Sequence, residues 1–440
     1  MRSSSSGPLR AGAHVVIVGG GPAGVSCGLA LQRSALQEGR DLTVTVLEGK
    51  ECVGEAQYNQ CVGVLSPPLA ELLEQPLGVS FPWHLVRADI EEYVLHAWRG
   101  TIALRGEGVT SSAVRRVQFD AFMLEQARER GIAVAAARAE DIEFHADGVV
   151  VYTEAGPMEA DVVVGAFGMD DGGAAIFQRS TGYRPPPALA SVVTKYHPGE
   201  SAMQAFGPRI HAFLPRHPRL EFGGITPKGN HLTINIAGAS VDSALMQEFL
   251  RLPEVRGVLP NLEQAGTLDA RDLRCFKGRF PVSLARRWYG DRYVMIGDAA
   301  GLVRPFKGKG ITSAVQTGVR AAETMLRAGI SQRAFENIYL AENADLTRDV
   351  PYGRAMRLMV IALARLGLFD LILAAGAAEP RLHQALFDAV SGNMPYRRVW
   401  LNGLAPRSLA AILRAAAGGL RVTSVRPGGQ DEVSSLHNLH

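Results

Sequence analysis

The sequence predicts an α/β protein built from a Rossmann-like nucleotide-binding domain, an inserted antiparallel sheet and a C-terminal helical region. Residues 14–33 have the pattern of a buried strand, a glycine-rich turn and a helix, the order that opens a nucleotide-binding fold. After about residue 185, short strand-like runs alternate with proline and glycine turns, which is typical of an antiparallel sheet. Beyond residue 332 the pattern is helical to about residue 419.

The composition limits the classes of protein to which the chain can belong. Its 440 residues are too many for one simple core, and 47% hydrophobic with 20% charged residues is typical of a folded protein. The net charge is only +3 and long Lys/Arg blocks are absent, so we expect no nucleic-acid partner. The cysteines lack zinc or disulfide spacing, so we expect no metal site and a reducing, cytoplasmic environment. They are Cys27, Cys52, Cys61 and Cys275.

We expect the nucleotide-binding domain to be discontinuous, at residues 13–184 and 276–330. The reason is that a buried strand at 292–298 and a helix at 310–327 follow the inserted sheet. That sheet forms a predicted substrate domain at residues 185–275, and the helical region is expected at 331–420. The tails, residues 1–12 and 421–440, are expected to be disordered. Further strands are expected at residues 41–48, 149–154, 160–166, 188–195, 209–214 and 231–237, and a further helix at 119–130.

The first candidate cofactor segment is the turn with the pattern Gly19-x-Gly21-x-x-Gly24. The first glycine permits a turn that a Cβ would obstruct, the second lets the backbone approach a pyrophosphate, and the third lets the helix pack on the strand. The start of the helix offers free N–H groups and a partial positive charge to the phosphates. An acid at the end of the next strand can accept hydrogen bonds from ribose hydroxyls. The candidate residues are Gly19, Gly21, Pro22, Ala23, Gly24 and Glu48.

The glycine turn fits FAD and NAD equally, and a second segment at residues 297–311 favours FAD. An aspartate at the end of a buried strand can bind a ribityl hydroxyl, while glycine and proline residues let a loop lie against the flavin ring. A helix that begins near Gly310 directs its N-terminus at the flavin N1 and C2 carbonyl, which favours the anionic reduced flavin by roughly 0.3–2 kcal/mol. The candidate residues are Gly297, Asp298, Pro305, Gly308, Gly310 and Ile311.

With these two segments the chain resembles the geranylgeranyl reductase family, within the wider group that includes the flavin aromatic hydroxylases. The family has an Arg-x-x-Phe-Asp segment whose arginine lies near FAD, and Arg116 stands at that position, with a solvated helix-cap charge as the alternative. Its Cys-x-Gly segment approaches the flavin. The resemblance therefore makes Cys61 a candidate catalytic residue, with a small buried hydrophobe as the alternative. The resemblance covers residues 14–66, 115–131, 161–168, 222–236 and 293–323.

A third segment matches the family's Tyr-x-Trp-x-Phe-Pro-Lys motif in part. Phe222, Pro227 and Lys228 correspond to it, so the resemblance implies that they contact the substrate, with a simple hairpin turn as the alternative for the last two. Gly224 stands where the family has a large aromatic residue that shapes the lipid pocket, which leaves the pocket wider or differently filled. Phe167 replaces an aspartate that related hydroxylases associate with FAD and NAD(P)H contacts.

The resemblance implies an FAD-dependent reductase that transfers hydride from reduced flavin N5 to a carbon–carbon double bond of a prenyl lipid. Candidate proton donors are Cys61, Tyr58 and His231. The external reductant, NAD(P)H or a ferredoxin-like protein, stays open because of Phe167. Two alternatives are a flavin monooxygenase of an aromatic or polyketide-like substrate and a flavin-bound lipid carrier without turnover. A halogenase is disfavoured because its Trp-x-Trp-x-Ile-Pro motif is absent from the sequence.

The segment at residues 389–430 is a candidate for docking on a membrane surface. It contains no acidic residue, and six arginines alternate there with apolar side chains, a pattern that suits an anionic bilayer, with a solvated helix face as the alternative. Residues 1–8 lack the apolar stretch of a signal peptide, and the longest apolar segment, 358–378, is interrupted by Arg365 and Asp370. We therefore expect a cytoplasmic protein. The arginine-rich segment adds the hypothesis that it attaches peripherally to the inner face of the membrane. The sequence predicts no oligomeric state.

Overall fold

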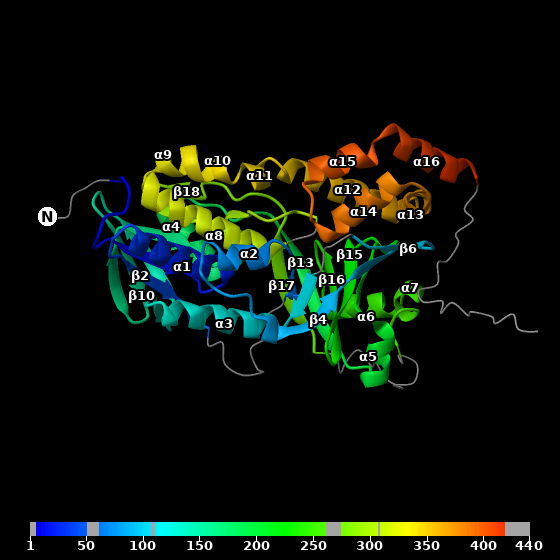
Figure 1. Ribbon diagram of the computed structural model, residues 1–440, viewed down its shortest axis with the longest axis horizontal. Helices are drawn as coiled ribbons and strands as arrows, with labels where there is room; N and C mark the ends of the chain where they lie inside the picture. The colour runs from blue at the N-terminus through cyan, green and yellow to red at the C-terminus, as the bar shows by residue number, and fades with distance from the viewer. Residues whose placement is uncertain (1–5, 51–60, 107–110, 261–273, 307–308, 419–440) are drawn as a thin grey trace, which may run out of the picture.

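The structure is a computed structural model that describes residues 6–50, 61–106, 111–260, 274–306 and 309–418. Figure 1 shows two sheets side by side, with the N-terminal sheet at the left and a second sheet at the right. Helices from the end of the chain lie above the second sheet (Figure 1). The predicted α/β architecture, with an antiparallel sheet and a C-terminal helical region, is confirmed.

The first sheet has the strand order β18-β19-β12-β1-β2-β8, and all neighbours except β18 and β19 run parallel. Its central strand β1 (His14–Val18) is almost completely buried because helices cover the sheet. The remaining strands are β2 (Thr43–Leu47), β8 (Ala133–Ala135), β12 (Val162–Gly165), β18 (Tyr289–Gly290) and β19 (Tyr293–Met295).

Two helices at opposite ends of this domain's sequence pack closely together. They are α1 (Pro22–Gln37) and α8 (Gly310–Arg327). Gly318 makes the contact possible, because a Cβ at this position would lie 2.5 Å from the carbonyl oxygen of Ala23 and 3.0 Å from the amide nitrogen of Cys27. Other helices of this half are α2 (Leu69–Glu74), α3 (Arg116–Glu129) and α4 (Asp171–Thr181), with short 3₁₀ turns at Trp83–Leu85 and Gly297–Ala300.

Two smaller antiparallel sheets lie beside the large ones, the first against the parallel sheet and the other against the second large sheet. The first has the order β11-β10-β9, so the strand predicted at residues 149–154 lies outside the parallel sheet. The other has the order β3-β7-β4. Their strands are β3 (Val64–Leu65), β4 (Val86–Ile90), β7 (Ser111–Val114), β9 (Ala139–Phe144), β10 (Val149–Thr153) and β11 (Gly156–Ala160).

The second sheet extends beyond the range predicted for the inserted domain. Its order is β17-β13-β16-β15-β14-β5-β6, so it includes β5 and β6 from the earlier part of the chain and β17 from the later part. The sequence analysis did not predict β5 and β6 or their place in this sheet, which β5 joins by long-range parallel pairing with β14. The strands are β5 (Glu92–His96), β6 (Thr101–Leu104), β13 (Ala188–Tyr196), β14 (Arg209–Phe213), β15 (Phe222–Lys228), β16 (His231–Gly238) and β17 (Phe276–Pro281).

The C-terminal helices cover one face of the second sheet. Tyr93 and Leu95 of β5 point toward them and share an apolar core with Met356, Val360 and Phe387. The opposite face carries α5 (Glu200–Phe206), α6 (Ser243–Arg251) and α7 (Pro253–Arg256). The C-terminal region begins with the short helical segments Gln332–Ala334, Phe335–Tyr339, Leu340–Glu342 and Ala344–Thr347. It continues with α12 (Val350–Leu366), α13 (Phe369–Ala378), α14 (Pro380–Ser391), α15 (Tyr396–Gly403) and α16 (Pro406–Ala417).

Buried carboxylates connect this helical region to the rest of the chain. Asp370 accepts hydrogen bonds from the backbone N–H groups of Arg99 and Gly100, at 3.0 and 2.8 Å, and so holds the turn between β5 and β6. Glu221 forms a two-pronged ion pair with Arg357 of α12, at 2.6 and 2.8 Å. In the described part of the chain, no single helix has the length and apolarity to cross a bilayer. One pair, Ala344–Leu366 and Phe369–Ala378, meets these criteria together but is bent by 105°.

Candidate cofactor and substrate site

A cavity of about 1840 Å³ connects the glycine turn to the C-terminal helices. It begins at Gly19, Gly21 and Glu48, passes Asp298, and ends among apolar side chains of α12 to α16. Pockets for a single drug-sized ligand measure roughly 300–1,000 Å³, so this cavity has room for a dinucleotide together with a second molecule.

The glycine turn has the geometry that its sequence predicts. Gly19 has φ = +113°, and a Cβ there would lie 2.5 Å from the carbonyl oxygen of Ala166. A Cβ at Gly24 would collide with the carbonyl oxygen of Gly19, so α1 can start close to β1 only with glycine here. By contrast, a Cβ at Gly21 would meet nothing within 4 Å, because this residue faces the cavity. Pro22 and Ala23 also line the cavity.

Glu48 is fixed at the end of β2 by backbone hydrogen bonds. Its carboxylate accepts from the N–H groups of Gly20 and Lys50, at 3.0 and 2.9 Å. These bonds hold the side chain at the cavity wall beside the glycine turn. The position suits a carboxylate that accepts hydrogen bonds from a ribose.

The second candidate segment lies directly against the first. Gly297 has φ = +58°, and a Cβ on it would lie 3.0 Å from the Cβ of Ala23, so the two segments approach each other closely. Asp298 lines the cavity, whereas Gly297 is not among the lining residues. Burial raises the pKa of Asp298, and the nearby Arg116 guanidinium counteracts this rise.

Arg116 lies at the start of α3 and lines the cavity. It forms an ion pair of 2.6 Å with Asp120, one helical turn further along. Burial by itself would lower the pKa of Arg116, but the carboxylate of Asp120 raises it above the ordinary value. This side chain is therefore a largely buried, ion-paired cation within electrostatic range of Asp298 and Cys61, and not a solvated helix-cap charge. Its contact with FAD stays a prediction.

The loop before α8 is held by the C-terminal region. Arg304 donates hydrogen bonds of 2.7 Å to the carbonyl oxygens of both Gly392 and Met394. Lys309 donates to the side-chain oxygen of Asn393, at 2.7 Å. The loop residue Pro305 and the start of α8 line the cavity beyond this clamp. Gly310 and Ile311 line the cavity from α8, together with Ala314, while Gly308 lies outside the described residues.

Cys61 lines the cavity, and Lys228 lies behind the same segment. The Nζ of Lys228 would be 3.0 Å from a Cβ built on Gly63. Of the predicted substrate contacts, Phe222 is on the cavity wall, while Pro227 and Lys228 are not among its lining residues. A direct substrate contact of these two residues therefore stays a prediction that the geometry does not favour. Tyr58 lies outside the described residues, and His231 is not among the lining residues either.

The two departures from the family pattern both lie on the cavity wall. Phe167 stacks on Phe177 with 5.4 Å between ring centroids and meets Tyr183 edge to face, so an apolar cluster replaces a hydrogen-bonding carboxylate. At Gly224, a Cβ would lie 2.7 Å from the side-chain oxygen of Asn235. The space of the family's aromatic residue is therefore filled in part by an amide.

The sequence analysis missed four polar residues at or beside the cavity, Tyr93, Ser111, Glu221 and Arg357, whereas Ser66 belongs to the segment at Cys61 that it singled out. The hydroxyl of Tyr93 lies 3.4 Å from the Oγ of Ser111, which is 3.0 Å from the Oγ of Ser66. Tyr93 and Ser66 line the cavity, and Ser111 is buried beside them. The ion pair of Glu221 and Arg357 also lines the cavity. None of the four missed residues belongs to a recognisable motif, and β5 reaches the site only through long-range strand pairing.

No family model matches this chain, and no curated protein matches it in sequence. Solved structures do match. A geranylgeranyl bacteriochlorophyll reductase-like protein from Thermoplasma acidophilum is 16% identical, with 93% of this chain and 96% of that chain covered and a TM-score of 0.64. A flavoprotein/dehydrogenase from Cytophaga hutchinsonii is 17% identical, with 92% and 100% covered and a TM-score of 0.65. The flavin-dependent brominase Bmp2 is 16% identical, with 92% and 98% covered and a TM-score of 0.61.

The chain has the fold of the FAD-dependent oxidoreductases. The side chains and helix ends of this flavoprotein fold also fit FAD. Within the residues that the structure describes, no side chain caps the N-terminus of α1 or of α8, and both ends border the cavity. Their free N–H groups suit a pyrophosphate at α1 and an electron-rich ring edge at α8.

Replacement of Asp298 tests the second cofactor segment of the flavoprotein fold. We expect Asp298→Ala to weaken FAD binding by about 1.5–3 kcal/mol, because a hydrogen bond from a ribityl hydroxyl to a buried carboxylate is lost. The ratio of flavin to protein absorbance after purification and gel filtration reports the loss. Asp41→Ala, at an exposed position, should keep its flavin. Full FAD retention in Asp298→Ala would show that the ribityl contact lies elsewhere.

The buried amine of Lys228 predicts a pH dependence of stability. Burial lowers the pKa of Lys228 to about 8, from 10.5. Between these values the unfolded chain binds the proton and the native chain does not, so the contribution of this group to stability rises with pH. Relative to Lys228→Met, the wild type should gain up to roughly 3 kcal/mol of unfolding free energy across this window.

Chemical denaturation at a series of pH values measures this gain. The exposed Lys277→Met is the matched control, and its stability should follow the wild-type curve. Parallel curves for the wild type and Lys228→Met would contradict the lowered pKa.

Proposed function

We propose that this chain binds FAD and reduces carbon–carbon double bonds of a prenyl lipid. The observation that carries the proposal is the continuous cavity, which joins the cofactor segments at one end to an apolar chamber at the other. A polar cofactor and an apolar chain would therefore meet inside the protein, away from solvent.

The proposed FAD position follows from the residues of the first half of the chain. The turn at Gly19–Gly24 and the start of α1 would hold the pyrophosphate, and Glu48 would bind the adenosine ribose. Asp298 would bind the ribityl chain, and the start of α8 at Gly310 would face the flavin ring. In its reduced form the bound cofactor supplies the hydride.

The shape and lining of the far chamber support an apolar substrate. The chamber lies between the second sheet and the C-terminal helices, and aliphatic and aromatic side chains form its wall. A prenyl chain has methyl-branched apolar surface and few hydrogen-bonding groups, so its burial there is driven by the hydrophobic effect. The lining residues from the helices include Met356, Val360, Leu363, Phe369, Ile372, Leu386 and Val390.

Reduction of the double bond also needs a proton at the second carbon. We propose Tyr93 as the donor, because its hydroxyl is buried at the cavity wall and is linked through Ser111 to Ser66. Ser66 lies on the segment that follows Cys61, and its carbonyl oxygen accepts a hydrogen bond from Thr312 of α8. The network therefore lies between the proposed flavin position and the apolar chamber. A chain of hydroxyls can replace the proton that Tyr93 gives up.

Anaerobic reoxidation of the flavin tests the reaction. The purified protein is reduced without oxygen, candidate prenyl lipids are added in detergent, and flavin absorbance and product mass are followed together. We expect reoxidation with a gain of two hydrogens per double bond. Reoxidation that needs oxygen and adds an oxygen atom would identify a monooxygenase instead. Absence of reoxidation by any prenyl lipid or oxidant would indicate a flavin-bound carrier.

Replacement of Tyr93 tests the proton donor. We expect Tyr93→Phe to slow reoxidation by the prenyl lipid roughly 100-fold, since general acid catalysis typically contributes 10²–10⁴-fold. The solvent deuterium isotope effect on this rate should differ between Tyr93→Phe and the wild type. The FAD content of the two proteins should be the same. Tyr152→Phe is the control, because its hydroxyl lies at an exposed site and donates to Glu143. An unchanged rate and isotope effect in Tyr93→Phe would assign the proton to another group.

A further inference from the structure

The exposed apolar side chains of this protein are concentrated on the C-terminal helices. Nine of the large ones, Tyr352 and eight leucine or methionine residues, lie on α12, the α12–α13 turn, α15 with its C-cap, and α16, and outside this region they are scattered. Leu366, Leu401 and Leu413 are each about two-thirds exposed, at 65%, 66% and 69%. We name these eight residues the apolar surface: Leu358, Met359, Leu366, Leu368, Leu401, Leu404, Leu409 and Leu413.

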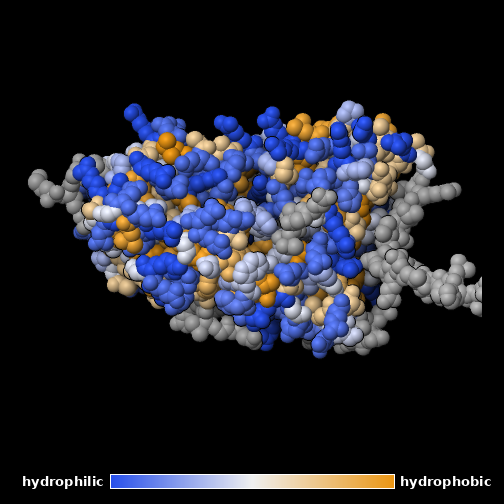
Figure 2. All heavy atoms as spheres, viewed as in Figure 1, coloured by the Kyte–Doolittle hydropathy of each residue, from blue (hydrophilic) through white to orange (hydrophobic). Residues whose placement is uncertain are grey.

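The helices that carry the apolar surface have positive charge and no negative charge. None of α12, α15 and α16 contains an aspartate or glutamate. Of the three acids in the intervening residues 367–395, Asp370 and Asp388 are buried, and Glu379 accepts a hydrogen bond at the start of α14. The exposed arginines are Arg354, Arg365, Arg397, Arg398, Arg407 and Arg414. In Figure 2 hydrophilic and hydrophobic atoms lie next to one another over these helices, at the upper right.

Part of the apolar surface also borders the cavity. Met359 of α12, Leu404 at the C-cap of α15 and Leu409 of α16 are exposed to solvent and also line the cavity. Trp400 lines it between them and is held by a hydrogen bond from its indole N–H to the carbonyl oxygen of Tyr352, at 3.1 Å. The apolar end of the cavity therefore lies directly beneath the apolar surface, beside the exposed arginines of the same helices.

We propose that this face docks on an anionic phospholipid surface and that the substrate enters from the bilayer between α12, α15 and α16. Leucines that enter the acyl region and arginines that contact headgroup phosphates are the combination that holds interfacial helices on membranes. The entry route rests on the proposed prenyl substrate, whereas the docking does not. A second copy of this chain fits less well, because a two-fold contact through this face would oppose arginines to arginines.

Vesicle binding without turnover tests the docking. The flavin-loaded protein is mixed with vesicles of phosphatidylcholine alone or with added phosphatidylglycerol, and the bound fraction is measured by flotation at low and high salt. We expect binding to the anionic vesicles that weakens with salt. Arg397→Glu/Arg398→Glu and Leu401→Ser/Leu413→Ser should each weaken it by about tenfold or more. None of these four residues lines the cavity.

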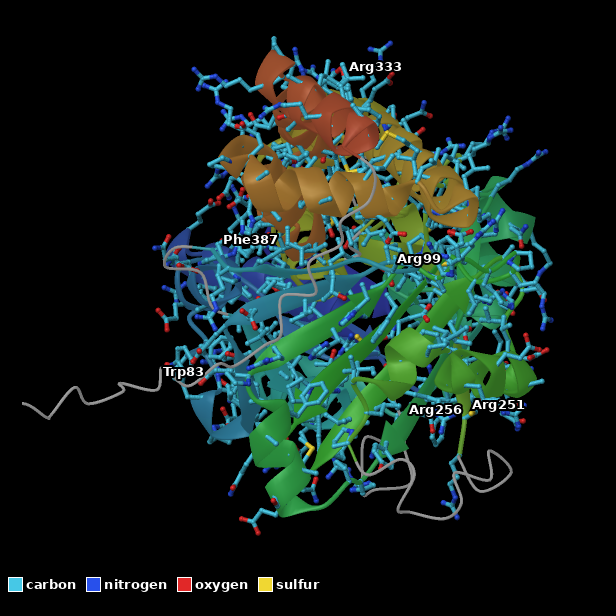
Figure 3. All side chains as sticks on the ribbon, turned by 90° about the vertical axis from the view of Figure 1, so that its right-hand side faces the viewer. Trp83, Arg99, Arg251, Arg256, Arg333 and Phe387 are labelled. Carbon is cyan, nitrogen blue, oxygen red and sulfur yellow. The ribbon has the colours of Figure 1, made fainter. Side chains whose placement is uncertain are left out.

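Two matched controls lie far from the proposed surface. Arg251→Glu changes an exposed arginine that Figure 3 places well below the C-terminal helices, and Leu36→Ser changes an exposed leucine at the end of α1. Both should bind vesicles as the wild type does. Equal binding of all variants, or no binding to anionic vesicles, would overturn the proposal. The proposal would also be overturned if light scattering showed that the wild type is a dimer and that the Leu401→Ser/Leu413→Ser variant is a monomer.

The same preparations separate this proposal from the proposed reaction. Reoxidation by a detergent-solubilised prenyl lipid should be unchanged in the docking variants, because the cofactor site and the chamber are intact. With substrate supplied in vesicles, the docking variants should turn over more slowly than the wild type. Vesicle binding without any prenyl turnover would reject the reaction and keep the docking. Turnover in detergent without vesicle binding would reject the docking and keep the reaction.

Discussion

The close contact between α1 and α8 is the constraint on which the rest of the structure depends. Gly318 lets the backbones touch at Ala23 and Cys27, and Gly297 brings the loop before α8 against the same part of α1. Both cofactor segments are therefore held in one place although more than 250 residues separate them in the sequence. A side chain at either glycine would push these two segments apart.

The cavity that starts at this contact changes its chemistry along its length. Near α1 and α8 it has backbone N–H groups, Asp298 and the ion-paired cation Arg116, which suit a charged cofactor. Further along, the ion pair of Glu221 and Arg357 lies in a mostly apolar wall. Because both partners are held by two hydrogen bonds, this pair satisfies its own charges and leaves the chamber suited to an apolar molecule. Phe387 of α14 packs edge to face on Tyr93 at the junction of helices and sheet (Figure 3).

The C-terminal helices have two roles in this arrangement. They form the wall of the chamber, and through Gly392, Asn393 and Met394 they clamp the loop that carries Pro305. A displacement of α14 and α15 would therefore move the flavin loop as well as the apolar end of the cavity. This coupling gives a physical route by which contact with a membrane at α15 and α16 would influence the cofactor end.

The sequence by itself determined the features that depend on local chemistry. The glycine spacing at residues 19–24, the strand before it and the helix at Gly310–Arg327 could be predicted, because turns, buried strands and amphipathic helices have short-range patterns. The tertiary structure alone decided which distant segments meet. It joined β5 to the second sheet and so brought Tyr93 to the cavity, and it placed Pro227 and Lys228 outside the wall. The physical reason is that strand pairing and side-chain packing are set by contacts across the whole chain, which no local pattern records.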